Sequence, residues 1–257
     1  MAIWQDHLKS ASFIEKRIMR SINKTILNAL PDIPRWIEAR SMLIRNKGIA
    51  MGFEEGQNNF PQGVLYQEDI GLGVIVGKPS ADLIFQLSEL ADEIICPEDH
   101  SGHFSEAFED WTYEGADLYQ QKTISTASIN TAIKPAWLKQ SNLDRAEGIS
   151  KPLLDELQEE LMAGTEIFFA SADNQPASFC FACAKTETFW DVSIETITKF
   201  QRRGLARQCF QMAYQEMNRH SLIPIWAAVD SNTASKAMAE NLGFEPKDRL
   251  MVFTRRT

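Results

Sequence analysis

Long hydrophobic runs are missing from this sequence. Nowhere do about 18 apolar residues stand together, which is the length that a membrane-spanning helix needs. The N-terminal stretch MAIWQDHLKSASFIEK also lacks the uninterrupted apolar core and the small-residue cleavage site of a secretory signal peptide. We therefore expect a cytoplasmic protein with no membrane partner.

Cysteine is scarce. The chain has 4 cysteines in 257 residues, too few and too scattered for a disulfide framework. Cys180 and Cys183 stand close together, but in a strand they would point to opposite faces, and no second pair accompanies them. His100 and His103 flank Ser-Gly in a predicted loop without recognisable partner ligands. We expect core packing for the cysteine pair, and no metal site.

Positive charge is in short supply too. The chain has 26 lysines and arginines against 35 aspartates and glutamates, which gives a formal net charge of -9. Binding to nucleic acid depends largely on neutralising phosphates with basic side chains, so we do not expect a nucleic-acid partner. An acidic protein suits small cationic substrates better.

Tracts of glycine, serine or proline are absent as well. Hydrophobic residues make up 44% of the chain and charged residues 24%, close to the averages for folded domains. The whole chain is therefore expected to fold, and its length allows one large domain or two small ones.

The first part of the chain alternates helix and strand signals. Apolar residues at every fourth position from Ile14 to Leu30 follow one face of a long helix, which Pro31 ends. Next we expect a helix at residues 34–47 and, within residues 63–76, two strands around a polar turn. A helix capped by Ser80 is expected at residues 81–91, and a strand at residues 93–96. We interpret residues 1–120 as an α/β half whose role the sequence does not indicate.

The second part has a clearer pattern. We expect helices at residues 152–162, 204–220 and 233–241. We expect strands at residues 167–170, 178–185, 190–197 and 224–229. The strand, helix and strand within residues 190–229 would form a parallel right-handed unit. Because ligands of such sheets bind at the carboxyl ends of the strands, the loop Thr198–Arg203 lies at the expected ligand edge.

The start of the helix at residues 204–220 has the composition of a phosphate-binding turn. Gly204 and Ala206 have too little side chain to obstruct an anion. The unpaired N–H groups of the first turn and the helix dipole would face a pyrophosphate. Four cations with no acidic neighbour in the sequence surround the turn: Lys199, Arg202, Arg203 and Arg207. The alternative is an ordinary solvated helix start.

This segment resembles the Gcn5-related N-acetyltransferase (GNAT) family. The family's pyrophosphate-binding signature is Gln or Arg, two residues, Gly, one residue, then Gly or Ala, which Gln201, Gly204 and Ala206 meet. A helix, the strand IWAAV, Asn232 and a second helix follow in the family's order, as far as Leu-Gly-Phe at Phe244. The segments IETITKFQRRGLA, PIWAAVDSNTAS and AENLGF further resemble the zwittermicin-resistance subgroup.

The resemblance implies a fold and an activity. Residues 121–257 would form an α/β (α+β) acetyltransferase domain with a GNAT-type mixed central sheet flanked by helices, preceded by a family-specific N-terminal half. The activity would be transfer of an acetyl group from acetyl-CoA, the cosubstrate, to a primary amine of a small molecule. The sequence names neither the acceptor nor the oligomeric state.

The resemblance also implies site residues. The strand backbone of Ile194, Glu195 and Thr196 would bind the pantetheine arm. The pyrophosphate site would consist of Gln201, Arg202, Arg203, Gly204, Leu205, Ala206 and Arg207. Asn232 and Ser235 would complete the CoA site.

The catalytic residues are less clearly indicated. Many family members have a tyrosine, the general acid, four residues before the glycine of Leu-Gly-Phe, where this chain has Ala239. Ser235, one turn earlier, is either an acid or a hydrogen-bonding residue on the helix side. Glu195 is either the proton acceptor for an ammonium substrate or the ion-pair partner of a loop arginine, and Glu187 is a second candidate base.

The missing tyrosine leaves an alternative function open. A catalytically weak protein could bind acyl-CoA and act as a sensor or regulator. Release of free thiol from acetyl-CoA in the presence of an amine distinguishes the two functions.

Overall fold

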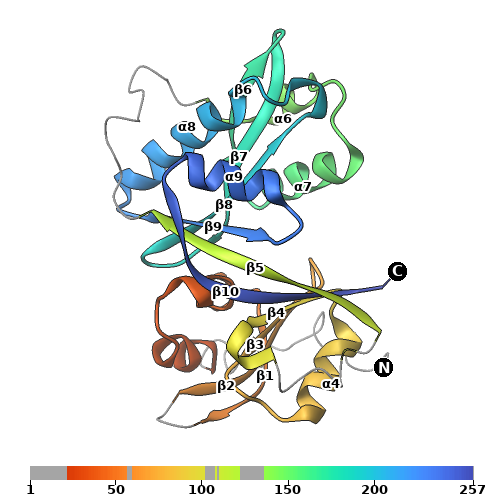
Figure 1. Ribbon diagram of the computed structural model, residues 1–257, viewed down its shortest axis with the longest axis vertical. Coiled ribbons are helices and arrows are strands. Elements are labelled where there is room, and N and C mark those ends of the chain that lie inside the picture. The colour runs from red at the N-terminus through yellow and green to blue at the C-terminus, as the bar shows by residue number, and fades with distance from the viewer. Residues whose placement is uncertain (1–21, 57–59, 102–107, 109, 122–135, 257) are drawn as a thin grey trace. The chain divides into compact units, whose positions relative to one another are not determined.

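The computed structural model describes residues 22–56, 60–101, 108, 110–121 and 136–256 (Figure 1). Two compact units make up the chain. The first contains Met1–Asp117, Val229–Ser231 and Asp248–Thr257, and the second contains Leu118–Ala228 and Asn232–Lys247. Within the described ranges, no helix combines the length and the apolar character that a membrane crossing requires.

The first unit is a sheet with helices. Residues 22–29 are helical, whereas the start of the helix predicted from Ile14 lies outside the described residues, as does His103. The later elements are a 3-10 turn (Pro34–Trp36), α3 (Ile37–Ile44), β1 (Ile49–Glu55), β2 (Pro61–Gln67), β3 (Leu72–Val76), α4 (Ala81–Leu90), β4 (Glu93–Pro97), α5 (Glu98–Ser101) and β5 (Trp111–Gln121).

The strand order begins β1-β2-β3-β4-β10-β5, in which β10 (Phe244–Arg255) comes from the C-terminal end of the chain. β3 and β4 pair in parallel, whereas β2 pairs antiparallel with both β1 and β3, and β10 pairs antiparallel with β4. Helices cover both faces because the central strands are apolar on both sides, and every residue of β3 is buried. Ile75 packs with Leu87 of α4, whereas Val74 packs with Met42 of α3.

The expected elements between residues 34 and 97 are confirmed, with two corrections. β1 is not predicted from the sequence, because Gly52 adopts a φ of 59° and the pairing register shifts between Met51 and Glu54. Ser80 does precede α4, but its side chain makes no capping hydrogen bond.

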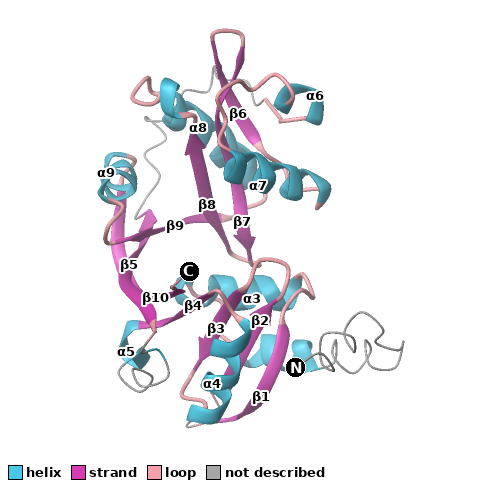
Figure 2. Ribbon diagram, turned by 90° about the vertical axis from the view of Figure 1, so that its right-hand side faces the viewer, coloured by secondary structure: helices cyan, strands magenta, loops and turns pink. Residues whose placement is uncertain are grey.

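The second unit contains the parallel strand pair expected from the sequence. Its strands are β6 (Phe168–Ala172), β7 (Gln175–Lys185), β8 (Phe189–Thr196) and β9 (Ile223–Val229), in the order β9-β8-β7-β6. Its helices are α6 (Gln140–Leu143), α7 (Lys151–Met162), α8 (Leu205–Arg219) and α9 (Thr233–Asn241). β6, β7 and β8 form an antiparallel meander, and β8 and β9 are parallel (Figure 2). The predicted mixed α/β fold is confirmed.

α8 packs against the strands of the second unit. The ring centroid of Phe210 lies 6.2 Å from that of Trp190 on β8 and 6.1 Å from that of Trp226 on β9. Cys180 is buried in the core around α8, and Cys183 is half-buried against it, so the expected core packing is confirmed. All 4 cysteines are free thiols. The helix thereby contacts both β8 and β9.

Candidate active site

The parallel pairing of β8 and β9 stops early. Its residue pairs are Phe189↔Ile223, Trp190↔Pro224 and Asp191↔Ile225. β8 continues to Thr196, still paired with β7, and Figure 2 shows that β9 diverges from it. Among the described residues, the β9-facing backbone of β8 beyond Asp191 therefore has no strand partner. A ligand can bind to these N–H and C=O groups.

Asp191 lies where the two strands separate. The residue is buried, and its carboxyl group accepts a hydrogen bond from the N–H of Val192 at 2.9 Å and another from the backbone of Ala227 on β9. The carboxyl group thus contacts β9 beyond the last residue pair. Burial raises the pKa of this carboxyl to about 6.

The turn at the end of β8 has the backbone geometry of an anion site. After the 3-10 turn Thr198–Phe200, Gly204 is the N-cap of α8 in the left-handed conformation, with a φ of 77°. No side chain caps the helix, and a Cβ on Gly204 would meet nothing within 4 Å. The first N–H bonded within α8 is that of Gln208. The preceding N–H groups, from Leu205 to Arg207, are the unpaired donors of a first helical turn.

The cationic side chains of this turn are less isolated from acidic residues than the sequence predicts. Two of them have acidic partners after all: Lys199 lies 4.0 Å from Glu147, and Arg203 lies 3.4 Å from Asp173. These acids are distant in sequence and reach the turn only in the folded chain. Arg202, with a φ of 59°, and Arg207 make no ion pair within the described part of the chain. Both are exposed and can contact phosphate.

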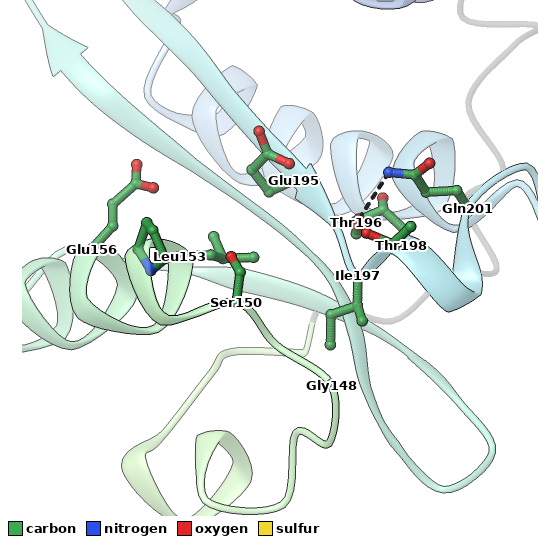
Figure 3. Close-up of a pocket in the computed structure, with 10 residues that line it drawn as sticks. Gly148, Ser150, Leu153, Glu156, Glu195, Thr196, Ile197, Thr198 and Gln201 are labelled. Atoms are coloured by element: carbon green, nitrogen blue, oxygen red, sulfur yellow. Dashed lines mark hydrogen bonds between the residues drawn. The ribbon is translucent and has the colours of Figure 1, made fainter.

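A cavity of about 320 Å³ lies beside the end of β8 (Figure 3). This volume is at the lower end of the range for small-molecule sites, about 300–1,000 Å³. The lining residues come from α7 and the loop before it, and from the end of β8 and the segment after it: Gly148, Ser150, Pro152, Leu153, Glu156, Glu195, Thr196, Ile197, Thr198 and Gln201. The contribution of α7 is not predicted, because no motif in its sequence marks it.

Hydrogen bonds fix the strand end that borders the cavity. Ser178 on β7 donates to the carbonyl of Glu195 at 3.1 Å, and its hydroxyl lies 2.8 Å from that of Thr196. The amide of Gln201 donates to the carbonyl of Thr196 at 3.4 Å. Ile194 is half-buried against the core. The hydrogen bond between Gln201 and Thr196 therefore connects the phosphate turn to the strand residues that are expected to contact pantetheine.

Glu195 lines the cavity as an exposed residue of β8. Partial desolvation raises the pKa of its carboxyl, and a hydrogen bond from the Thr196 backbone partly opposes this rise. Among the described residues it has no ion-pair partner, because Arg203 and Lys199 pair elsewhere. The ion-pair alternative is therefore not what the structure shows, and the carboxylate is available to accept a proton.

Glu187 does not belong to this site. It lies in the turn before β8, at the opposite end of the strand from Glu195. At about 3.3 Å per residue, the strand separates the two carboxylates by roughly 25 Å.

The start of α9 is a hydrogen-bonded unit. Asn232 caps the helix by accepting from the N–H of Ser235 at 3.0 Å. The Ser235 hydroxyl oxygen accepts from the indole N–H of Trp226 at 2.8 Å. Ala239, where many GNAT proteins have the tyrosine, is fully buried in the core. These contacts favour the hydrogen-bonding role of Ser235, and its role as an acid stays a hypothesis.

Ser235→Ala separates these two roles. The substitution leaves the buried indole N–H of Trp226 without its acceptor, so the free energy of unfolding should fall by about 1–3 kcal/mol. Turnover should stay within about threefold of the parent, because a missing general acid would cost about 100-fold or more. Denaturant unfolding and steady-state kinetics measure both quantities. Unchanged stability together with a large loss of turnover would instead identify Ser235 as the acid.

Comparison with known proteins agrees with this geometry. Residues 167–253 match the model of the GNAT acetyltransferase family. No curated protein sequence is significantly similar to the chain. A GCN5-related N-acetyltransferase-like protein from Streptococcus suis is similar in structure, with a TM-score of 0.66 and 16% identity over 93% of this chain and 100% of that chain. An acetyltransferase of the GNAT family from Colwellia psychrerythraea has a TM-score of 0.59 and 12% identity over 93% of this chain and 96% of that chain.

Identities this low show a shared fold rather than a shared substrate. The fold of the chain is that of these solved GNAT structures. Together with the family match over residues 167–253, it makes this part of the chain similar to the GNAT acetyltransferases.

Proposed function

We propose that this protein is an N-acetyltransferase that transfers the acetyl group of acetyl-CoA to a primary amine of a small molecule. The observation that carries the proposal is the split between β8 and β9, which leads directly into the turn Gln201–Arg207. We further propose residues 121–257 as the acetyltransferase domain, and the zwittermicin-resistance subgroup as its relatives on the strength of the sequence segments alone.

The residues present fit a CoA ester. The extended pantetheine arm can take the place of a strand partner along Ile194–Thr196, because β9 has diverged there. The pyrophosphate can accept from the N–H groups after Gly204, where no side chain obstructs it. Arg202 and Arg207 supply positive charge that no described carboxylate neutralises.

The cavity is the proposed acceptor site, and Glu195 is the proposed base. The ammonium group of the substrate gives a proton to the Glu195 carboxylate, and the neutral nitrogen attacks the thioester carbonyl. A C–N bond forms and the C–S bond breaks; the attacking nitrogen loses its second proton to become the amide, and the CoA thiolate takes up a proton, so that CoA leaves as the thiol. Positioning and backbone N–H donors near the carbonyl supply the remaining catalysis.

An acyl-CoA sensor is the second candidate function, and one observation favours it. Ala239 is buried, and the Ser235 hydroxyl already accepts a hydrogen bond, so neither position presents an obvious acid to the departing thiolate. A sensor would bind acetyl-CoA tightly without releasing thiol in the presence of any amine.

CoA binding is the first test of the proposal. A ligand at a hundred times its Kd stabilises the folded state by about 2.7 kcal/mol, and each kcal/mol raises the Tm of a chain of this size by about 2–4 °C. Saturating CoA should therefore raise the Tm by about 5–10 °C in a thermal-shift measurement. Adenosine without phosphates is the matched control and should have a much smaller effect. The absence of a shift with either CoA or acetyl-CoA would contradict the cosubstrate assignment.

A further inference from the structure

Glu156 is a second carboxylate in the cavity, and the proposed proton transfer does not use it. It lies on α7, whereas Glu195 comes from β8 (Figure 3). Its neighbours Leu153 and Leu157 pack against the core of the second unit, and Leu157 is fully buried. These contacts fix α7 against the core of the second unit, so Glu156 has a defined place on the cavity wall.

The two carboxylates interact through the space between their elements. Desolvation raises the pKa of Glu156, and the charge of Glu195 raises it further, ahead of smaller effects from Glu160 and Glu159. Glu156 has no cationic partner in the described part of the chain, and the lining residues include neither lysine nor arginine. Both residues are exposed, and a cation bound between them in the cavity would relieve the repulsion between their carboxylates.

One ammonium group does not satisfy this charge. Under the proposed function, the amine that is acetylated gives its proton to Glu195 and attacks as a neutral nitrogen. Glu156 then still has an unpaired negative charge. The complementary acceptor therefore has a second cationic group, which remains protonated while the first amine reacts.

We propose that Glu156 determines acceptor specificity by binding a second ammonium group of the substrate, so that diamines are preferred over monoamines. The inference rests on the proposed function, because it takes the cavity to be the acceptor site. Glu156 is thus a binding residue that does not take part in proton transfer.

Binding tests the inference without requiring turnover. The full chain, saturated with CoA, is titrated in a calorimeter with putrescine and with butylamine, which differ by one amino group. A hydrogen bond to a charged group predicts that the parent binds putrescine at least about tenfold more tightly than butylamine. Glu156→Gln keeps the size of the side chain and removes its charge, so the two affinities should come within about threefold of each other.

Two further variants separate a specific role from a general one. Glu159→Gln removes a charge from the same helix outside the cavity lining, and should keep the preference for putrescine. Glu156→Asp keeps the charge and should retain most of the preference. With acetyl-CoA present, Glu156→Gln should raise the KM for putrescine at least about tenfold and leave kcat within about threefold.

The outcomes are distinguishable. The inference is overturned if the parent binds the two amines equally, if it binds neither, or if Glu156→Gln keeps the preference for putrescine. A preference that depends on Glu156, without acetylation of either amine, overturns the proposed function and leaves the cation site in place.

Discussion

Glu195→Gln should reduce kcat by about 100- to 10,000-fold, the usual cost of a missing general base. Glu195 lines the cavity without a cationic partner in the described chain, and desolvation raises the pKa of its carboxyl. Only the ionised carboxylate accepts a proton, so kcat/KM of the parent, which reports the pKa of the free protein, should rise with pH through this pKa. The raised pKa places the acidic limb above the ordinary range for a glutamate. The variant should lack this limb.

The matched measurement is CoA affinity. Glutamine preserves the strand and the Glu195 carbonyl that Ser178 binds, so the Kd for CoA should stay within about threefold of the parent. If kcat stays within about threefold while the acidic limb persists, Glu195 is not the base. The substrate amine would then lose its proton to another group.

Gly204→Asp should weaken CoA binding at least about 100-fold, because an added carboxylate beside a phosphate costs several kcal/mol. The structure allows the side chain, since a Cβ at this position meets nothing within 4 Å. The backbone φ of 77° is left-handed, a conformation that aspartate and asparagine tolerate better than other residues. The fold should therefore survive the substitution.

Gly204→Asn is the matched control, because it has the same shape and the same backbone cost without the charge. It should weaken CoA binding by about tenfold or less, as expected for a modest steric effect. Calorimetric titration of both variants gives the comparison. Equal affinities for CoA in the two variants would show that no phosphate lies next to Gly204.

The elements from α7 to α9 follow from the sequence because their signals are local. Each of these helices and strands has its own apolar period, and the observed bounds lie within a few residues of the expected ones. β10 gives no comparable prediction, because its role depends on pairing with β4, which is far away in the chain. Long-range pairing of this kind leaves no mark in a local pattern.

The candidate site also has one part that local sequence predicts and another that depends on the tertiary structure. Gln201, Gly204 and Ala206 form a local motif, so the phosphate turn is predictable from its spacing. The cavity cannot be predicted in this way, because Glu156 is one of several acidic residues on α7 and only the tertiary structure places it in the cavity lining. The ion pair between Arg203 and Asp173 likewise joins residues from separate loops, which is why the turn has fewer free cations than its sequence indicates.

The most direct test of the account is acetyl transfer itself. The purified chain is incubated with acetyl-CoA and a panel of primary amines that includes putrescine, and free thiol and acetylated amine are measured together. The account predicts that thiol is released in step with an acetylated product, and that Glu195→Gln lowers both. Tight binding of acetyl-CoA, without thiol release above the protein-free rate for any amine, would contradict it and identify the protein as a sensor.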